Sequence, residues 1–322
     1  MRMWTKFLIL VLLILSNLSC VRGRNESNVE NLTIYGLRGS PGVGIIHLFE
    51  EPPEITGFNV KVEALAQADL MAARFIAGEV QVGILPPNMA AKIYTSGGDI
   101  KMAAVIGEGM LSLLTSDPNI KEIEDLRGKT VALHGQGATP EYVFQRILRS
   151  HGLIPNTDVI LNYALGAPEI AQSLIAGRIS LALLPEPFAT MALLGKPDLI
   201  LVSDIQEEWI KAEGIGNYPM TLLVFNGTFA TANADVVEEI LNAVRASIEQ
   251  VITRPAEAGD LVEKHGLGIS APVVTAAVSR SNYVFIPAIE ARPSLEALFK
   301  VFLEYDPVSI GGVLPGDGFY LR

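Results

Sequence analysis

The residues with the clearest chemical potential are polar or aromatic side chains that follow short apolar segments. Hydroxyl, amide, guanidinium, carboxylate and phenol groups can hydrogen-bond to a small molecule, and a phenol ring can also stack on one. These residue types do not combine a nucleophile with a nearby base, so they indicate binding rather than catalysis. The candidates for ligand contact are Arg38, Ser40, Asn88, Gln136, Thr139, Glu186 and Tyr218.

Several candidates also have a purely structural interpretation. Ser40 and Thr139 each precede a proline, a combination that caps and starts helices whether or not a ligand exists. Asn88 and Glu186 follow apolar segments and could serve as caps or hinge hydrogen bonds. Tyr218 could stack on a flat ligand or simply pack a hinge. Both interpretations stay open from the sequence alone.

Metal and nucleotide chemistry have no motif in this chain. The histidines are scattered, and neither HExxH nor another ligand spacing joins His47, His134, His151 and His265. There is no P-loop. We therefore expect neither a metal nor a cofactor.

The elements that must position the candidates occur twice. Residues 77–90 read AGEVQVGILPPNMA, and residues 176–189 read AGRISLALLPEPFA, 99 positions later. No gap is needed at this offset over more than fifty positions. Other matched pairs are Leu32–Gly36 with Val131–Gly135, and Ser40-Pro41 with Thr139-Pro140.

Each copy predicts strand, helix, strand, helix, strand. The helices are predicted at Val43–Glu50 and Tyr142–His151, and again at Asp69–Ala77 and Pro168–Ala176. The strands after them are predicted at Asn59–Ala64 and Asp158–Tyr163, and at Val80–Leu85 and Ile179–Leu184. Alternating strands and helices indicate α/β architecture, so we predict two similar lobes, each a mostly parallel sheet flanked by helices.

Two apolar segments connect the lobes. Gly109–Thr115 and Pro219–Phe225 stand just before and just after the second copy, which predicts two crossings. Lobe 1 is then expected to contain residues 30–113 and 222–322, with residues 114–221 inserted as lobe 2. A body of two lobes joined by a double hinge can close on a ligand.

The ligand is expected between the lobes. In α/β sheets ligands bind outside the carboxyl ends of the strands, where helix N-termini favour anions or hydrogen-bond acceptors. Glu186 indicates a different kind of ligand, because a carboxylate repels a simple anion and favours a ligand with hydrogen-bond donors or a positive charge. Arg38 lies in one of these loops, although it could equally be a solvated loop cation.

The start of the chain resembles an export signal. Arg2 and Lys6 precede the apolar run Phe7–Leu15, which is too short to span a bilayer that needs about 20 helical residues. Residues 1–19 are predicted to be removed, which leaves Cys20 as a lipid-modified first residue. Asn17 and Leu18 depart from the usual lipobox, so cleavage elsewhere is the alternative. Residues 20–30 would be a polar tether.

Composition limits the partners. The chain has 322 residues, 49% hydrophobic and 18% charged, enough for a large core in two domains. Loss of residues 1–19 removes two positive charges and no acid, so the net charge changes from −11 to −13. An acidic body argues against nucleic acid as a partner.

Taken together, these motifs resemble a known family. The export signal with its cysteine, LRGKTVALHGQGATPEYVFQRILRSHGL, LLPEPFATMAL and YDPVSIGGVLPGDGFY are similar to ABC-transporter substrate-binding proteins. The group includes nitrate, sulfonate and taurine receptors and the thiamine-pyrimidine (NMT1/THI5-like) binders. The resemblance covers nearly the whole mature chain but does not select a ligand.

The resemblance implies a periplasmic-binding-protein fold with two hinge crossings. It also implies ligand capture by domain closure, ligand contacts at Ser40 and Thr139, and delivery to a membrane permease powered by a separate ATPase. The protein is then expected to be a lipid-anchored monomer on the periplasmic or extracellular face of a bacterial envelope, and not an enzyme.

Two alternatives remain. Menaquinone-pathway and pyrimidine-synthesis enzymes resemble the same fold, so architecture alone does not exclude catalysis. The sequence argues against it, because a cysteine-rich motif of the pyrimidine enzymes has no counterpart after Cys20. A ligand-sensing domain would use identical residues, but no signalling domain is attached.

Overall fold

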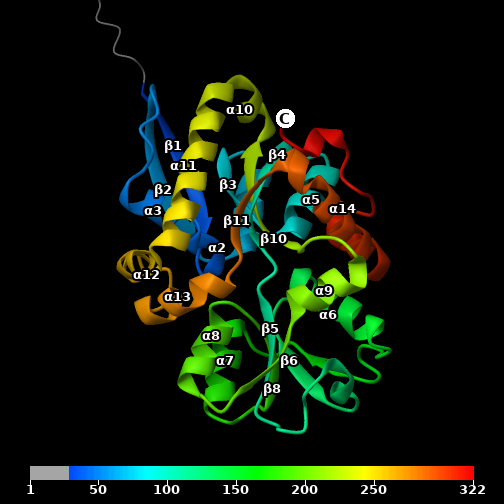
Figure 1. Cartoon of the computed structure of the whole chain (residues 1–322). Coiled ribbons are helices and arrows are strands. Elements are labelled where there is room, and N and C mark those ends of the chain that lie inside the picture. Colours follow the sequence, from blue (N-terminus) through cyan, green and yellow to red (C-terminus); the bar gives the residue numbers. More distant parts are fainter. Residues whose placement is uncertain (1–28) are drawn as a thin grey trace, which may run out of the picture.

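The computed structural model describes residues 29–322, which form two α/β lobes joined by a narrow waist (Figure 1). The predicted export signal (residues 1–19), Cys20 and most of the predicted tether lie outside the described residues. Within residues 29–322, no helix has the length and apolar character needed to cross a membrane. Two lobes of mixed strands and helices confirm the predicted α/β class.

Lobe 1 is built on a six-stranded sheet with the order β11-β4-β10-β3-β1-β2. These strands are β1 (Glu30–Leu37), β2 (Phe58–Leu65), β3 (Val82–Leu85), β4 (Ile100–Glu108), β10 (Pro219–Asn226) and β11 (Tyr283–Pro287). Lobe 2 is built on a five-stranded sheet with the order β7-β6-β8-β5-β9. Its strands are β5 (Leu111–Thr115), β6 (Thr130–Leu133), β7 (Ile160–Asn162), β8 (Leu181–Pro185) and β9 (Ile200–Asp204).

The prediction of mostly parallel sheets is wrong. Only the strands of each repeated copy are parallel, namely β2-β1-β3 and β7-β6-β8. The strands next to them pair antiparallel: β10 with β3 and β4, β11 with β4, and β5 with β8 and β9. These strands are largely buried and read as continuous apolar runs, so the sequence pattern does not reveal their direction.

Helices cover both faces of each sheet. Those of lobe 1 are α2 (Ser40–Val43), α3 (Ile46–Glu50), α4 (Ala68–Ile76), α5 (Pro87–Thr95), α10 (Gly227–Ala232), α11 (Ala234–Thr253), α12 (Pro255–Lys264), α13 (Ala271–Ala277) and α14 (Ala288–Tyr305). Those of lobe 2 are α6 (Thr139–Ser150), α7 (Ala167–Ile175), α8 (Phe188–Gly195) and α9 (Ile205–Glu213). The short 3-10 helices are η1 (Ile123–Leu126), η2 (Val278–Arg280), η3 (Pro307–Ile310) and η4 (Asp317–Phe319).

The two copies of the repeat have the same strand order but not the same register. Ile34 pairs with Val82, 48 positions further on, whereas Leu133 pairs with Leu183, 50 positions further on. Pairing with the second strand shows the same two-residue shift. The helices after the first and second strands still start 99 positions apart, at Ser40 and Thr139 and at Ala68 and Ala167. The loop after the first strand is therefore longer in lobe 2, residues 134–138 against residues 38–39. The ungapped match missed this difference, because a shift of two keeps every side chain on its face.

The first predicted helix is also divided. The segment predicted as one helix, Val43–Glu50, forms α2 and α3 instead. Gly39 precedes α2 with φ 85° and ψ −160°, a conformation that favours glycine. This backbone geometry turns the chain sharply from β1 into the four-residue helix α2.

Two short segments cross between the sheets. The first is Gly109-Met110, between β4 and β5, and the second leads from α9 to β10 and contains Tyr218. The two crossings touch, because Gly109 N donates to Tyr218 O at 2.7 Å. Tyr218 also packs edge-on against Trp209. The crossings therefore form one packed hinge.

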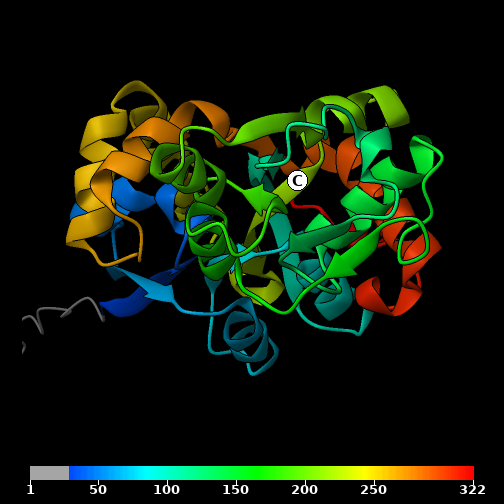
Figure 2. The same cartoon turned by 90° about the horizontal axis from the view of Figure 1, so that it is seen from below.

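The lobes also pack together beside the hinge. Tyr142 of α6 lies 5.3 Å from Phe302 of α14, centroid to centroid, and stacks on Tyr305. Its hydroxyl donates to Asp306 at 3.0 Å. A single hydrophobic cluster continues through this contact, whereas a separate cluster lies under α7 and α8. Seen from below, α14 (red) and the helices α12 and α13 (yellow to orange) lie at opposite ends of the molecule (Figure 2).

Candidate functional site

Four loops that follow parallel strands stand where the lobes face each other. Strands β1 and β3 of lobe 1 lead into α2 and α5, and strands β6 and β8 of lobe 2 lead into α6 and α8. Ser40, Asn88, Thr139 and Glu186 lie in or just before the first turns of these helices, and all four are buried. The repeat therefore places one polar candidate at each of the four strand ends.

Asn88 joins the two lobes. Its Nδ2 donates to the carbonyl oxygen of Gly137, at 3.2 Å, in the loop before α6. Asn88 Oδ1 and Thr139 Oγ1 have no hydrogen-bond partner among the described residues, although the two side chains are only 7% and 2% exposed. Buried polar atoms in proteins are nearly always hydrogen-bonded. A solute with a donor for the amide oxygen and a polar group for the hydroxyl would satisfy both atoms.

Ser40 belongs to a buried group at the first crossing. Ser40 Oγ donates to Met110 Sδ at 3.1 Å and lies 3.3 Å from the hydroxyl of Tyr283. Tyr283 is fully surrounded, and burial raises its pKa to about 12. The hydroxyl therefore stays protonated at neutral pH and remains a hydrogen-bond donor.

Glu186 is a buried carboxylate with partners from both lobes. Its Oε2 accepts from the backbone amide of Thr190 at 3.0 Å. Its Oε1 lies 2.9 Å from Arg280 Nε, without the alignment of a hydrogen bond. Burial raises the pKa of Glu186, and Thr190 and Arg280 offset this only in part. Glu186 is thus not the free cleft carboxylate that the sequence suggested.

Tyr218 packs in the hinge, which is the structural one of its two interpretations. Its ring is fully buried in the hinge, and its hydroxyl donates to Gln206 Oε1 at 3.0 Å. The two remaining candidates, Arg38 and Gln136, are exposed, and neither side chain has a hydrogen-bond or ion-pair partner within residues 29–322. The structure brings Asn88 to the loop before Thr139 through the carbonyl of Gly137. Gln136 lies in the same loop with an exposed side chain, whereas Arg38 and Tyr218 lie outside this contact.

A groove includes this contact. It has a volume of about 970 Å³, and its lining contains Asn88 and Gly137 together with residues of α4 and α5 of lobe 1. Lys92, Asp99 and Asp306 contribute charges of both signs to its walls. The groove gives the interlobe contact an open side.

Sequence reasoning missed several residues of the junction. Met110 and Tyr283 contact Ser40, and Arg280 contacts Glu186 and also donates to Ser112, yet none of these four residues lies in the repeated loops. Arg280 and Tyr283 come from the helical tail of the chain, for which the repeat supplies no counterpart. The only available signal was that this tail returns to lobe 1.

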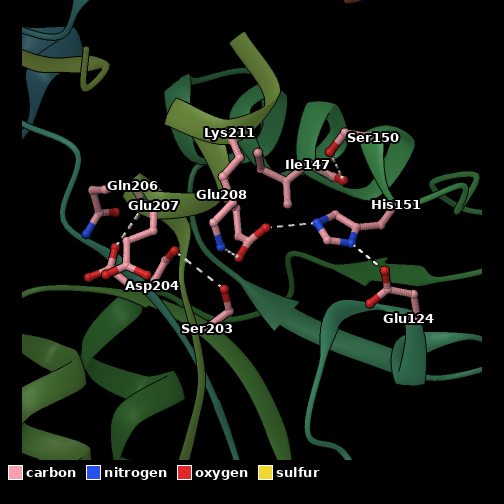
Figure 3. Close-up of polar contacts among 10 residues, drawn as sticks. All are labelled: Glu124, Ile147, Ser150, His151, Ser203, Asp204, Gln206, Glu207, Glu208 and Lys211. Carbon is pink, nitrogen blue, oxygen red and sulfur yellow. Dashed lines mark hydrogen bonds and ion pairs between the residues drawn. The ribbon is translucent and has the colours of Figure 1, made fainter. Parts of the chain in front are cut away.

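A histidine outside the junction ties together three elements of lobe 2. His151 Nδ1 lies 2.7 Å from Glu124 of η1, and Nε2 lies 2.9 Å from Glu208 of α9 (Figure 3). Lys211 donates to the other oxygen of Glu208 at 2.9 Å. Among residues 29–322 no group of three or more His, Cys, Asp or Glu side chains is arranged to hold a metal ion.

The two-lobed fold is that of periplasmic binding proteins. A similar structure is an ABC transporter protein from Parabacteroides distasonis, at TM-score 0.78 and 27% identity over 92% of this chain and 99% of that one. Another is the periplasmic aliphatic sulphonate-binding protein of Escherichia coli, at TM-score 0.70 and 18% identity over 91% and 94%. The periplasmic nitrate-binding protein of Synechocystis PCC 6803 matches at TM-score 0.62 and 11% identity over 89% and 83%.

The NMT1/THI5-like family model matches residues 56–258, which is more than half of the chain. The protein therefore belongs to the NMT1/THI5-like family. No curated protein matches the sequence. The resemblance noted from the sequence motifs is confirmed at the level of family and fold.

Proposed function

We propose that this protein is the extracytoplasmic solute-binding component of an ABC importer. It captures a small organic or anionic solute between its lobes and closes about the two crossings. The similar structures include binding proteins for sulphonate and nitrate, which supports this class of function. A membrane permease and its ATPase are the partners that follow from it.

One observation carries the proposal. Asn88 Oδ1 in lobe 1 and Thr139 Oγ1 in lobe 2 are buried polar atoms without a partner, and the lobes already touch between them through Gly137. A solute that bonds both atoms contacts both lobes at once, so it stabilises the closed arrangement over the open one. Ser40 and Glu186 complete the set of buried strand-end residues, while Arg38, Gln136 and Tyr218 have the weaker structural support.

The finer assignments rest on the sequence. Lobe 1 is proposed to contain residues 30–113 and 222–322, and lobe 2 residues 114–221. Removal of residues 1–19 would leave Cys20 as a lipid anchor, with residues 20–30 as the tether. The protein would act as a monomer on the outer face of the membrane, with no catalytic step.

A thermal-shift screen tests the function. The panel contains sulfonates, nitrate, bicarbonate, aminopyrimidines, thiamine and riboflavin. A solute that binds only the folded protein stabilises it by RT ln(1 + [L]/Kd), about 2.7 kcal/mol at a hundredfold excess over Kd. For a chain of this size that corresponds to a rise in Tm of a few degrees. A panel without any saturable shift would remove the support for solute capture.

A further inference from the structure

Arg280 is the one side chain of the lobe 1 tail that reaches a buried charge of lobe 2. It lies in η2, directly before β11 of the lobe 1 sheet. Its Nε is 2.9 Å from Glu186 Oε1, and its Nη2 donates to Ser112 Oγ at 3.1 Å. Glu186 directly follows β8 and Ser112 lies in β5, so both partners belong to lobe 2. One guanidinium thus contacts two residues of the opposite lobe, one by an ion pair and one by a hydrogen bond.

Burial makes this contact dependent on closure. Glu186 is 1% and Ser112 is 2% exposed, whereas the Arg280 side chain keeps 34% of its surface. Thr190 N holds the other oxygen of Glu186 from within lobe 2, so the carboxylate stays with that lobe when the lobes separate. Separation would then expose both charges to water, where their attraction is screened.

The position of the contact in the molecule fits the same role. Beside α6 and α14 the lobes share a continuous apolar cluster through Tyr142 and Phe302, which favours a fixed edge. Helix α13 of lobe 1 and helix α8 of lobe 2 face each other across the junction (Figure 1). Arg280 follows α13 and contributes a charged pair close to the first crossing, because Glu186 N donates to Met110 O at 2.9 Å.

We propose that Arg280 is the positioning residue that holds the lobes closed, through Glu186 and Ser112. The inference rests on the closure step of the proposed function and names no solute. Arg280 suits this task better than lysine, because its planar group pairs with Glu186 through Nε while Nη2 donates to Ser112. Lysine at this position would keep the charge but could not make both contacts in the same way.

The distance between the lobes tests this role directly. Spin labels are attached to cysteines introduced at Asp260 of lobe 1 and Asp198 of lobe 2, both exposed, in the whole chain carrying Cys20→Ser. Pulsed electron resonance then measures the distance distribution with no solute added. Arg280→Met is compared with Arg280→Lys, Glu186→Gln and Ser112→Ala. The matched control is Arg254→Met, which removes an exposed arginine that pairs with Glu257 inside lobe 1.

We expect the parent protein to show a short-distance population that Arg280→Met reduces about tenfold relative to the long one, with partial rescue by Arg280→Lys. Glu186→Gln should shift the same way, and Ser112→Ala less. The control should leave the distribution unchanged. A parent without the short population, or an equal shift in the control, would overturn the proposal.

Circular dichroism melting separates closure from folding. If Arg280→Met does not fold, the variants Ser112→Ala and Glu186→Gln test the proposal instead. Unchanged distances between the two spin labels in both variants would refute the role of Arg280. Because no solute is added, this experiment can fail while the thermal-shift screen succeeds, and the reverse also holds. The two proposals are therefore judged separately.

Discussion

At the scale of single residues, His151 shows how one titratable side chain can couple elements to pH. Burial alone would lower the pKa of His151, but hydrogen bonds and charges from Glu124 and Glu208 outweigh burial and raise it. A raised pKa means that the folded protein binds the proton more tightly than the unfolded chain. The contribution of His151 to stability is therefore fully present below its pKa in the unfolded chain, about 6.5. It is lost as the pH rises through the pKa of His151 in the folded protein.

The corresponding prediction concerns His151→Gln. Because the charged contacts to both glutamates disappear, we expect the free energy of unfolding to fall by about 1 kcal/mol at pH 6, and by less at pH 8.5. Chemical denaturation of both proteins across this pH range measures the difference. An equal loss at every pH would show that the imidazole stabilises by packing alone.

The predictability of the site also belongs to this scale. Ser40, Asn88, Thr139 and Glu186 were found because the repeat marks the strand ends, and the structure buries all four there. The ion pair of Glu186 was not found. Its partner, Arg280, is 94 positions away in a segment without a repeat, and sequence patterns do not place such distant charges together.

At the scale of elements, the hinge depends on the close approach of its two crossings. A Cβ added at Gly109 would lie 2.3 Å from Tyr218 Cζ and 2.6 Å from Asn217 Oδ1. Tyr218 cannot give way easily, because it is fully buried and bonded to Gln206. We therefore expect Gly109→Ala to destabilise the protein by about 1–3 kcal/mol, the usual cost of overpacking.

A matched control lies in the second crossing. A Cβ at Gly216 would meet no atom within 4 Å, and Gly216→Ala should leave stability unchanged or raise it slightly. Thermal melting compares the two variants with the parent protein. Equal melting temperatures for all three would contradict the packed hinge.

The elements themselves were largely predictable. Strands β3 and β8 and helices α4, α6 and α7 fall within a few residues of their predicted ranges. The direction of the strands could not be predicted, because it depends on how the chain re-enters each sheet after a crossing. The two-residue register shift was also invisible, since the apolar pattern of a strand has a period of two.

At the scale of the whole molecule, two sheets, a double hinge and buried polar atoms on facing strand ends describe a body suited to enclosing a solute. The number of lobes followed from the repeat. The two apolar segments predicted as crossings, Gly109–Thr115 and Pro219–Phe225, are mostly strands β5 and β10, and the connecting segments are Gly109-Met110 and residues 214–218. The relative arrangement of the two lobes could not be predicted from the sequence. It depends on the contacts of α6 with α14 and of Arg280 with Glu186, which join segments with no shared sequence pattern.

The central claim is that a solute binds between Asn88 and Thr139, and calorimetric titration tests it most directly. The titrant is the solute with the largest thermal shift, added to the parent protein, Asn88→Ala and Thr139→Val. Asn59→Ala, on the exposed side of β2, is the control. We predict that each cleft variant loses roughly two- to tenfold in affinity, as expected for one hydrogen bond, while the control binds like the parent protein. Unchanged affinity in both cleft variants would contradict the account.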